Sequence, residues 1–261
     1  MEPRICGGAG AGRLRRAPRS RALALALTAT LALSGCLEVE QTVTIAPNGG
    51  GTIDVVLRMS EATLADVQRA AAANQGGAPA DPGALFAEAS VRRELESAGL
   101  ELKAHAATRK DGARTVTLQA GFDAPATLRR SPLSGSAAEW EFTRGPVPGS
   151  IEVSFYPQGK AAWGEARQKA AAMGDTTDPV VEEFFERRRA QLRGLDVTVR
   201  LRLPGPVLRY TRNMEQTGDD EVTARVTEDR IRTPADLLRL LAPRYQVVFD
   251  AGACERFPLD P

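Results

Sequence analysis

The chain has 261 residues, with 34 lysines and arginines against 33 aspartates and glutamates, which gives a net charge of +1. This balance excludes a protein drawn to nucleic acid by its overall charge. Hydrophobic residues make up 43 % of the chain, which is enough for a packed core in one domain or two small ones.

The N-terminus has the composition of an export signal. Six arginines lie among residues 4–21, and the apolar stretch ALALALTATLAL follows at residues 22–33. A helix needs about 20 apolar residues to cross a bilayer, so this stretch is too short to span and has the length of a signal-peptide core.

Residues 33–36 read LSGC and match the bacterial lipobox at every position. In bacterial lipoproteins the cysteine thiol receives a diacylglycerol, the chain is cleaved in front of it, and the new amino terminus is usually acylated too. The sequence therefore predicts a signal peptide over residues 1–35, lipidation of Cys36, and a mature extracytoplasmic domain over residues 36–261. The alternative is a plain secretory signal followed by a chance cysteine.

The predicted mature chain is near neutral and begins its fold at once. Residues 1–35 carry six arginines and one glutamate, so the remaining 226 residues have a net charge of −4. No Ser/Gly/Pro tether separates Cys36 from the strand pattern LEVEQTVTI. We expect the domain to lie against the membrane surface. Leu37 after the cysteine resembles the pattern sorted to the outer membrane, if the cell has one.

Period-two alternation of apolar and polar residues predicts amphipathic strands. The hairpin signals PNGG and Asp111-Gly112 separate two pairs of them. Strands with one polar face are typical of antiparallel sheets. The expected strands are residues 37–45, 51–59, 100–106, 113–122, 138–142, 150–156, 195–203, 221–227 and 245–249.

Four helices are predicted among these strands, at residues 61–73, 84–99, 180–194 and 236–242. Gly99 is placed to end the second, and Thr233 with Asp236 resembles a capping box before the last. Together the elements indicate an α+β fold with antiparallel strand pairs and interspersed helices. A weak domain boundary is possible near residues 145–150, in the loop RGPVPGS.

The sequence contains no recognisable catalytic motif. HExxH, Walker A and GxSxG are absent, and the one histidine, His105, lies on the polar face of its strand. We expect Cys254, the one cysteine left after Cys36, to be a small buried hydrophobe. We predict a non-enzymatic protein with no metal site and no cofactor. The acidic groups Glu182-Glu183 and Asp219-Asp220-Glu221 fit helix-dipole and turn chemistry, and a glycosidase pair stays open.

Two arginine-rich segments are candidate binding residues. Arg187, Arg188, Arg189 and Arg193 end a predicted helix, where they either compensate the helix dipole in solvent or contact anionic headgroups. Arg209 and Arg212 lie in LRLPGPVLRYTRN, whose two prolines most simply mark a bend between strands.

Two stretches resemble the LppM-type family of actinobacterial envelope lipoproteins. They are LSGCLEVEQTVTIAPNGGGTIDVVLRM and LPGPVLRYTRNMEQTGDDEVTARVT. The resemblance implies a compact, partly barrel-like α+β domain outside the cytoplasm that contacts lipid or glycolipid and has no known enzymatic chemistry.

The sequence thus predicts a lipid-anchored envelope domain that binds a ligand near the membrane, with lipid or glycolipid preferred. Its partners would be the membrane, through acylated Cys36, and a lipid, glycolipid or envelope protein, but not nucleic acid. The alternative function is a structural or assembly lipoprotein that docks on an envelope complex through an exposed sheet edge. An envelope hydrolase is a third possibility.

Overall fold

The computed structural model describes residues 37–65, 86–135, 137–173, 178–254 and 257–259. It confirms an α+β fold. The predicted signal peptide and Cys36 lie outside these residues. The described strands are β1 (Leu37–Ile45), β2 (Gly51–Ser60), β3 (Glu101–Lys110), β4 (Ala113–Phe122), β5 (Glu139–Arg144), β6 (Ser150–Tyr156), β7 (Leu195–Arg202), β8 (Val207–Tyr210), β9 (Glu215–Gln216), β10 (Glu221–Thr227) and β11 (Tyr245–Asp250).

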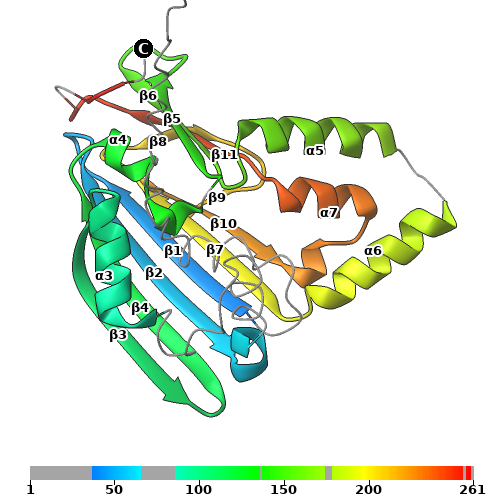
Figure 1. The fold of residues 1–261 in the computed structure, drawn as a ribbon. Coiled ribbons are helices and arrows are strands. Elements are labelled where there is room, and N and C mark those ends of the chain that lie inside the picture. Colours follow the sequence, from blue (N-terminus) through cyan, green and yellow to red (C-terminus); the bar gives the residue numbers. More distant parts are fainter. Residues whose placement is uncertain (1–36, 66–85, 136, 174–177, 255–256, 260–261) are drawn as a thin grey trace, which may run out of the picture.

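The strands form two sheets (Figure 1). The larger sheet has seven strands in the order β3-β4-β2-β1-β7-β10-β9, and the smaller has four in the order β5-β6-β11-β8. The large sheet curls, but its edge strands β3 and β9 do not pair with each other, so it stays open and is only partly barrel-like.

One strand pair differs from the predicted antiparallel arrangement, because β1 and β7 are parallel. All other described neighbours in both sheets are antiparallel. A buried parallel sheet would be apolar on both faces, but β1 keeps its wet face with the alternating burial pattern BeBeBiBiB. A single parallel pair inside a mixed sheet can leave one face in solvent, so its strands alternate in the same way as antiparallel strands. The alternation therefore did not reveal that β1 and β7 are parallel.

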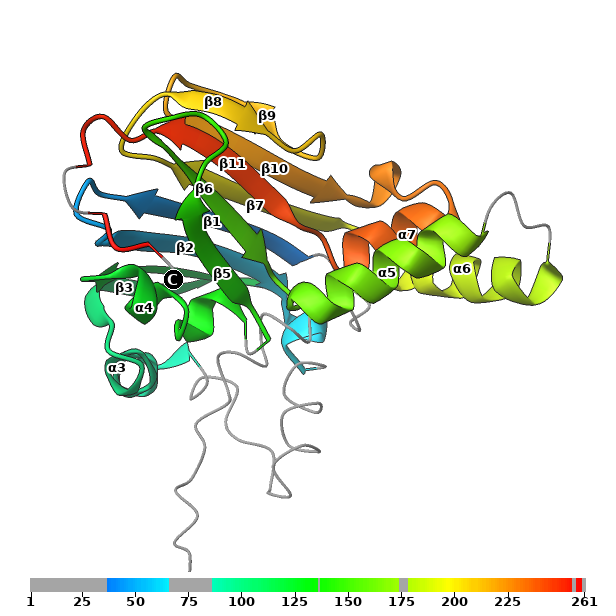
Figure 2. The same cartoon turned by 90° about the horizontal axis from the view of Figure 1, so that it is seen from above.

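The smaller sheet and the helices cover one face of the large sheet (Figure 2). The described helices are α3 (Glu88–Ser97), α4 (Pro125–Leu128), α5 (Lys160–Met173), α6 (Pro179–Gln191) and α7 (Pro234–Leu241), with short 3₁₀ turns η3 (Pro132–Ser134) and η4 (Glu228–Arg230). Helices α5 and α7 lie side by side at the end where β7 begins, and α6 projects from the same end.

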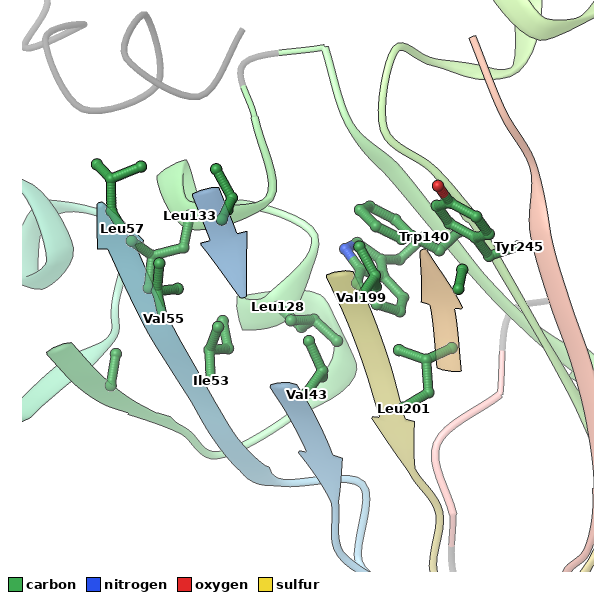
Figure 3. Close-up of a cluster of buried hydrophobic side chains, with 14 of the residues drawn as sticks. Val43, Ile53, Val55, Leu57, Leu128, Leu133, Trp140, Val199, Leu201 and Tyr245 are labelled. Atoms are coloured by element: carbon green, nitrogen blue, oxygen red, sulfur yellow. The ribbon is translucent and has the colours of Figure 1, made fainter. Parts of the chain in front are cut away.

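A single hydrophobic cluster lies between the two sheets. Val43 and Ile53 from the large sheet meet Leu128, Leu133 and the aromatic residues of the small sheet (Figure 3). Trp140 stacks on Phe155 with ring centroids 4.0 Å apart. Alternating residues of both sheets thus supply the core, as expected for strands with one apolar face.

The predicted turns and caps are present. Asp111 and Gly112 both have positive φ, at 52° and 70°, as a two-residue hairpin turn requires. Gly99 follows α3 with φ 84° and donates its N–H to the Glu96 carbonyl. The Thr233 hydroxyl accepts from the Asp236 N–H and the Asp236 carboxylate accepts from the Thr233 N–H, a complete capping box.

Several elements differ from the sequence-based expectation. Helix α5 and strands β8 and β9 were not predicted, and the predicted helix at residues 61–73 is described only over its helical residues 61–65. Residues 145–150 join β5 to β6 in an antiparallel hairpin, and the hydrophobic cluster draws on residues before and after them.

Candidate functional site: an arginine-lined groove

A groove of about 700 Å³ opens where α5, α7 and the end of β10 meet the segment after β8. Its volume lies within the roughly 300–1,000 Å³ typical of small-molecule sites. The lining residues are Trp163, Ala166, Arg167, Thr211, Arg212, Asn213, Arg225, Val226, Arg230, Asp236, Arg239, Leu240, Ala242, Pro243, Arg244 and Tyr245.

The lining is strongly cationic, because it contains six arginines and one carboxylate, Asp236. Arg225 forms an ion pair with Asp196, and Arg239 forms one with Asp236. The other four arginines have no ion-pair partner within the described part of the chain: Arg167, Arg212, Arg230 and Arg244. A concave surface with this charge concentrates anions, because its walls focus the positive potential.

An aromatic ring lies among these charges. The Arg244 guanidinium carbon lies 4.6 Å from the centroid of the Trp163 ring, and that of Arg167 lies 5.6 Å away. Both guanidinium groups lie within cation–π range of the indole, a contact that leaves their N–H groups available. The Asn213 side chain donates to the Arg244 carbonyl at 3.0 Å, which ties the turn after β8 to the loop before β11.

Arg225 is positioned by a two-point contact. Its Nε lies 3.0 Å from Asp196 Oδ1, and its Nη2 also donates to the same carboxylate. The hydrogen bond from Arg225 holds the pKa of the Asp196 carboxyl below its ordinary value. Arg230 in turn donates to the Arg225 carbonyl at 3.0 Å. This corner of the groove is therefore prearranged, while among the described residues no carboxylate lies within ion-pair distance of Arg230.

A small apolar cavity of about 110 Å³ adjoins the groove and shares Val226, Leu240, Pro243 and Tyr245 with it. It lies between the two sheets, with Val39 and Gln41 on β1, three residues of β7 and Phe155 on β6 in its wall. An apolar cavity of about 150 Å³ in another protein accepts a benzene-sized guest, so this one suits a short apolar group.

Tyr245 stands at the junction of the groove and the cavity. Its side chain is buried, and burial raises the pKa of its phenol, so the hydroxyl stays protonated at neutral pH. Its ring packs against Phe155, with the ring centroids 6.0 Å apart. A protonated hydroxyl here can donate a hydrogen bond to a guest in either hollow.

The candidate arginines from the sequence are divided between different places. Arg212 lines the groove and also a neighbouring hollow of about 310 Å³, which Arg209 lines as well. The cluster at the end of α6 does not line the groove. There Arg187 pairs with Glu183, Arg188 donates to Gln191, and Arg189 lies 3.9 Å from Glu186, while Arg193 is exposed.

Other residues considered from the sequence lie outside the groove. His105 is half-buried on β3 rather than fully solvated. Cys254 is half-buried against the core, and burial raises the pKa of its thiol. Glu221 pairs with Arg202 at 2.6 Å. Within the described ranges no group of His, Cys, Asp and Glu side chains could hold a metal ion, and no helix is long and apolar enough to cross a membrane.

Five groove arginines were missed at the level of sequence: Arg167, Arg225, Arg230, Arg239 and Arg244. They are spread over α5, β10, η4, α7 and the loop before β11, so no local run of charge identifies them. The only local signal was Arg212 in the turn after β8.

Comparisons with known proteins add little to this geometry. No family model matches the sequence, and no curated protein matches it either. Among solved structures, the chain is similar to the NMR structure of the folded domain of LppM from Mycobacterium tuberculosis, with 13 % identity and a TM-score of 0.40. The alignment covers 84 % of this chain and 92 % of that one. At this similarity the comparison assigns neither a family nor a function.

Proposed function

We propose that this protein is a non-enzymatic, lipid-anchored domain of the bacterial envelope that binds an anionic amphiphile, a lipid or glycolipid, close to the membrane. The observation that carries the proposal is the cationic groove that opens beside an apolar cavity. The two hollows match the two halves of such a molecule.

The groove suits the charged half of the ligand. Arg212, Arg230 and Arg244 present guanidinium groups without carboxylate partners in the described residues, and a guanidinium fork binds phosphate or carboxylate oxygens in pairs. Each hydrogen bond to a charged group contributes about 1.5–3 kcal/mol. Trp163 holds Arg244 and Arg167 beside the groove through cation–π contacts.

The cavity suits the apolar half. Most of its wall is aliphatic or aromatic, and the polar side chains in it are Gln41, Ser134 and Gln158. Gln41 is buried and donates to the Leu133 carbonyl at 3.3 Å, so its amide is already engaged. Because the space is small, it holds the part of an acyl chain nearest to the headgroup rather than a whole chain.

The groove also lies at the end of the domain where the anchor would be. Leu37, directly after Cys36, pairs with Leu195 at the start of β7, and Val226 at the groove pairs with Val197 on the same strand. Strands are about 4.8 Å apart, so the end of β10 lies roughly 10 Å from the start of β1. Acyl chains on Cys36 would hold the groove near the bilayer.

Trp163 provides a direct test of ligand binding. Titration of the purified domain with short-chain phosphatidylglycerol below its micelle concentration is expected to change the tryptophan fluorescence saturably, because the headgroup displaces water beside Trp163, whereas Trp140 is buried outside the groove. Short-chain phosphatidylcholine, which has no net charge, is the matched ligand and is expected to bind more weakly. Equal responses to the two lipids, or no response to either, would contradict a cationic lipid site.

Docking on an envelope protein complex remains a second candidate, with one specific observation in its favour. Strand β8 forms an edge of the small sheet, and its Leu208 and Tyr210 are exposed. Such an edge can accept a strand from a partner. The groove favours the lipid ligand, because an edge strand alone does not account for its charge.

A further inference from the structure

Helix α6 carries an exposed apolar face. The side chains of Val180 and Phe184 are 74 % and 56 % exposed, the highest values among the large hydrophobic residues of the described part of the chain. They are four residues apart, so they lie one turn apart on the same side of the helix. Isolated exposed apolar residues are ordinary, but an exposed pair on one helix face is typical of an interaction surface.

An adjacent side of α6 packs against the body of the protein and fixes which face looks outward. Phe185 and Leu192, about 100° and 80° around the helix axis from Phe184, are buried and belong to the hydrophobic cluster. They hold the helix against the body of the protein, and Val181 and Arg188 lie half-buried at the boundary. Because these contacts hold the helix by that side, Val180 and Phe184 cannot turn inward without breaking the core packing.

The charges on α6 are arranged around the apolar pair. At about 100° per residue, Arg187 and Arg188 lie about 60° and 40° from Phe184, while Glu182 and Glu186 lie about 160° away. Arg187 pairs with Glu183 at 2.6 Å, and both side chains are mostly exposed. An exposed pair of this kind is weak, so Arg187 can exchange Glu183 for a lipid phosphate. The outward face is therefore apolar with arginines beside it.

The C-terminal end of α6 lies near the predicted anchor, and Phe184 lies about 12 Å further along the helix at 1.5 Å per residue. The helix leads through residues 192–194 into Leu195, the first residue of β7, and Leu195 pairs with Leu37. Cys36 is the next residue in the chain. In Figures 1 and 2, α6 projects from this end of the large sheet.

From these observations we propose that α6 lies on the bilayer surface, with Val180 and Phe184 inserted among the headgroups and Arg187 and Arg188 in contact with anionic lipids. The inference rests on the proposed lipid anchor at Cys36. Two apolar side chains offer far less area than the roughly 800 Å² per partner of a stable protein interface, but they suit a contact that adds to an anchor. The helix would fix the orientation in which the groove meets the membrane.

Bromine quenching tests this orientation in the acylated full-length protein. The Phe184→Trp variant is reconstituted in phosphatidylglycerol vesicles that contain lipids brominated near the headgroup end of their chains. The matched control is Val147→Trp, at an exposed residue in the β5–β6 turn, at the far end of the molecule. Both variants keep Trp140 and Trp163, so the difference between them reports the new indole. We expect at least about twofold more quenching for Phe184→Trp, since interfacial helices bury their apolar face about 5–10 Å deep.

Two results would overturn the proposal. Equal quenching of the two variants would show that α6 does not touch the bilayer. The exposed Val180 and Phe184 pair would then be a contact surface for another protein instead. If Phe184→Trp were quenched as strongly in phosphatidylcholine vesicles as in phosphatidylglycerol vesicles, the arginines would have no part in the contact. The intact mass of the same sample reports acylation separately, so the failure of α6 contact and the failure of the anchor are distinguishable.

Discussion

Replacement of Cys36 by alanine is expected to release the protein from the membrane. Without the thiol, no diacylglycerol can be attached, and cleavage in front of residue 36 has no acylated substrate. A single acyl chain gives only marginal membrane binding, whereas two or three chains give stable anchoring. The remaining contact through α6 is too small to replace them.

The measurement is fractionation of cells labelled with a radioactive fatty acid. The expected result is loss of label and a shift of the Cys36→Ala protein from the membrane fraction. Cys254→Ala is the matched control, because it removes the other cysteine of the mature chain and leaves the anchor intact. Continued labelling and retention of Cys36→Ala would refute the anchor.

The double substitution Arg212→Ala with Arg230→Ala is expected to weaken binding of an anionic amphiphile strongly. Neither guanidinium has a carboxylate partner in the described residues, so the substitutions leave no buried charge unpaired. With about 1.5–3 kcal/mol for each charge-assisted hydrogen bond, each arginine accounts for roughly tenfold to a hundredfold in affinity.

The measurement is the phosphatidylglycerol titration followed by tryptophan fluorescence. Arg92→Ala is the control, because Arg92 pairs with Glu88 on the exposed side of α3 and lies outside the groove. The milder change Arg212→Lys should give an affinity between those of the parent and the double variant, because lysine keeps the charge and loses the planar fork. A double variant that binds as tightly as the parent would exclude the groove as the headgroup site.

Affinity of the parent for phosphatidylglycerol should also fall as salt is added, because the charges are open to solvent.

Much of the fold could be predicted because long strands such as β1 and β2 bury one face. The alternation in residues 37–45 identified β1 with its observed bounds, and Asp111-Gly112 identified the β3–β4 turn. The parallel pairing of β1 with β7 could not be found in this way, since alternation reports which face is buried and not which neighbour a strand takes. Helix α5 was missed because its apolar residues are mostly small alanines, only two of which are buried.

The candidate site was much less predictable than the fold. Its six arginines come from six separate segments of the chain, and each looks locally like a solvated charge. The run of arginines in α6 drew attention because the residues are adjacent, yet three of them have partners within their own helix. Convergence of distant charges depends on topology, which a single sequence does not display.

Native mass spectrometry of the mature protein, extracted gently from its own membrane, tests the central claim most directly. The account predicts an acylated chain that begins at Cys36 and carries a bound anionic lipid or glycolipid, which the Arg212→Ala, Arg230→Ala variant loses. A chain with an unmodified Cys36 and no bound amphiphile would contradict it.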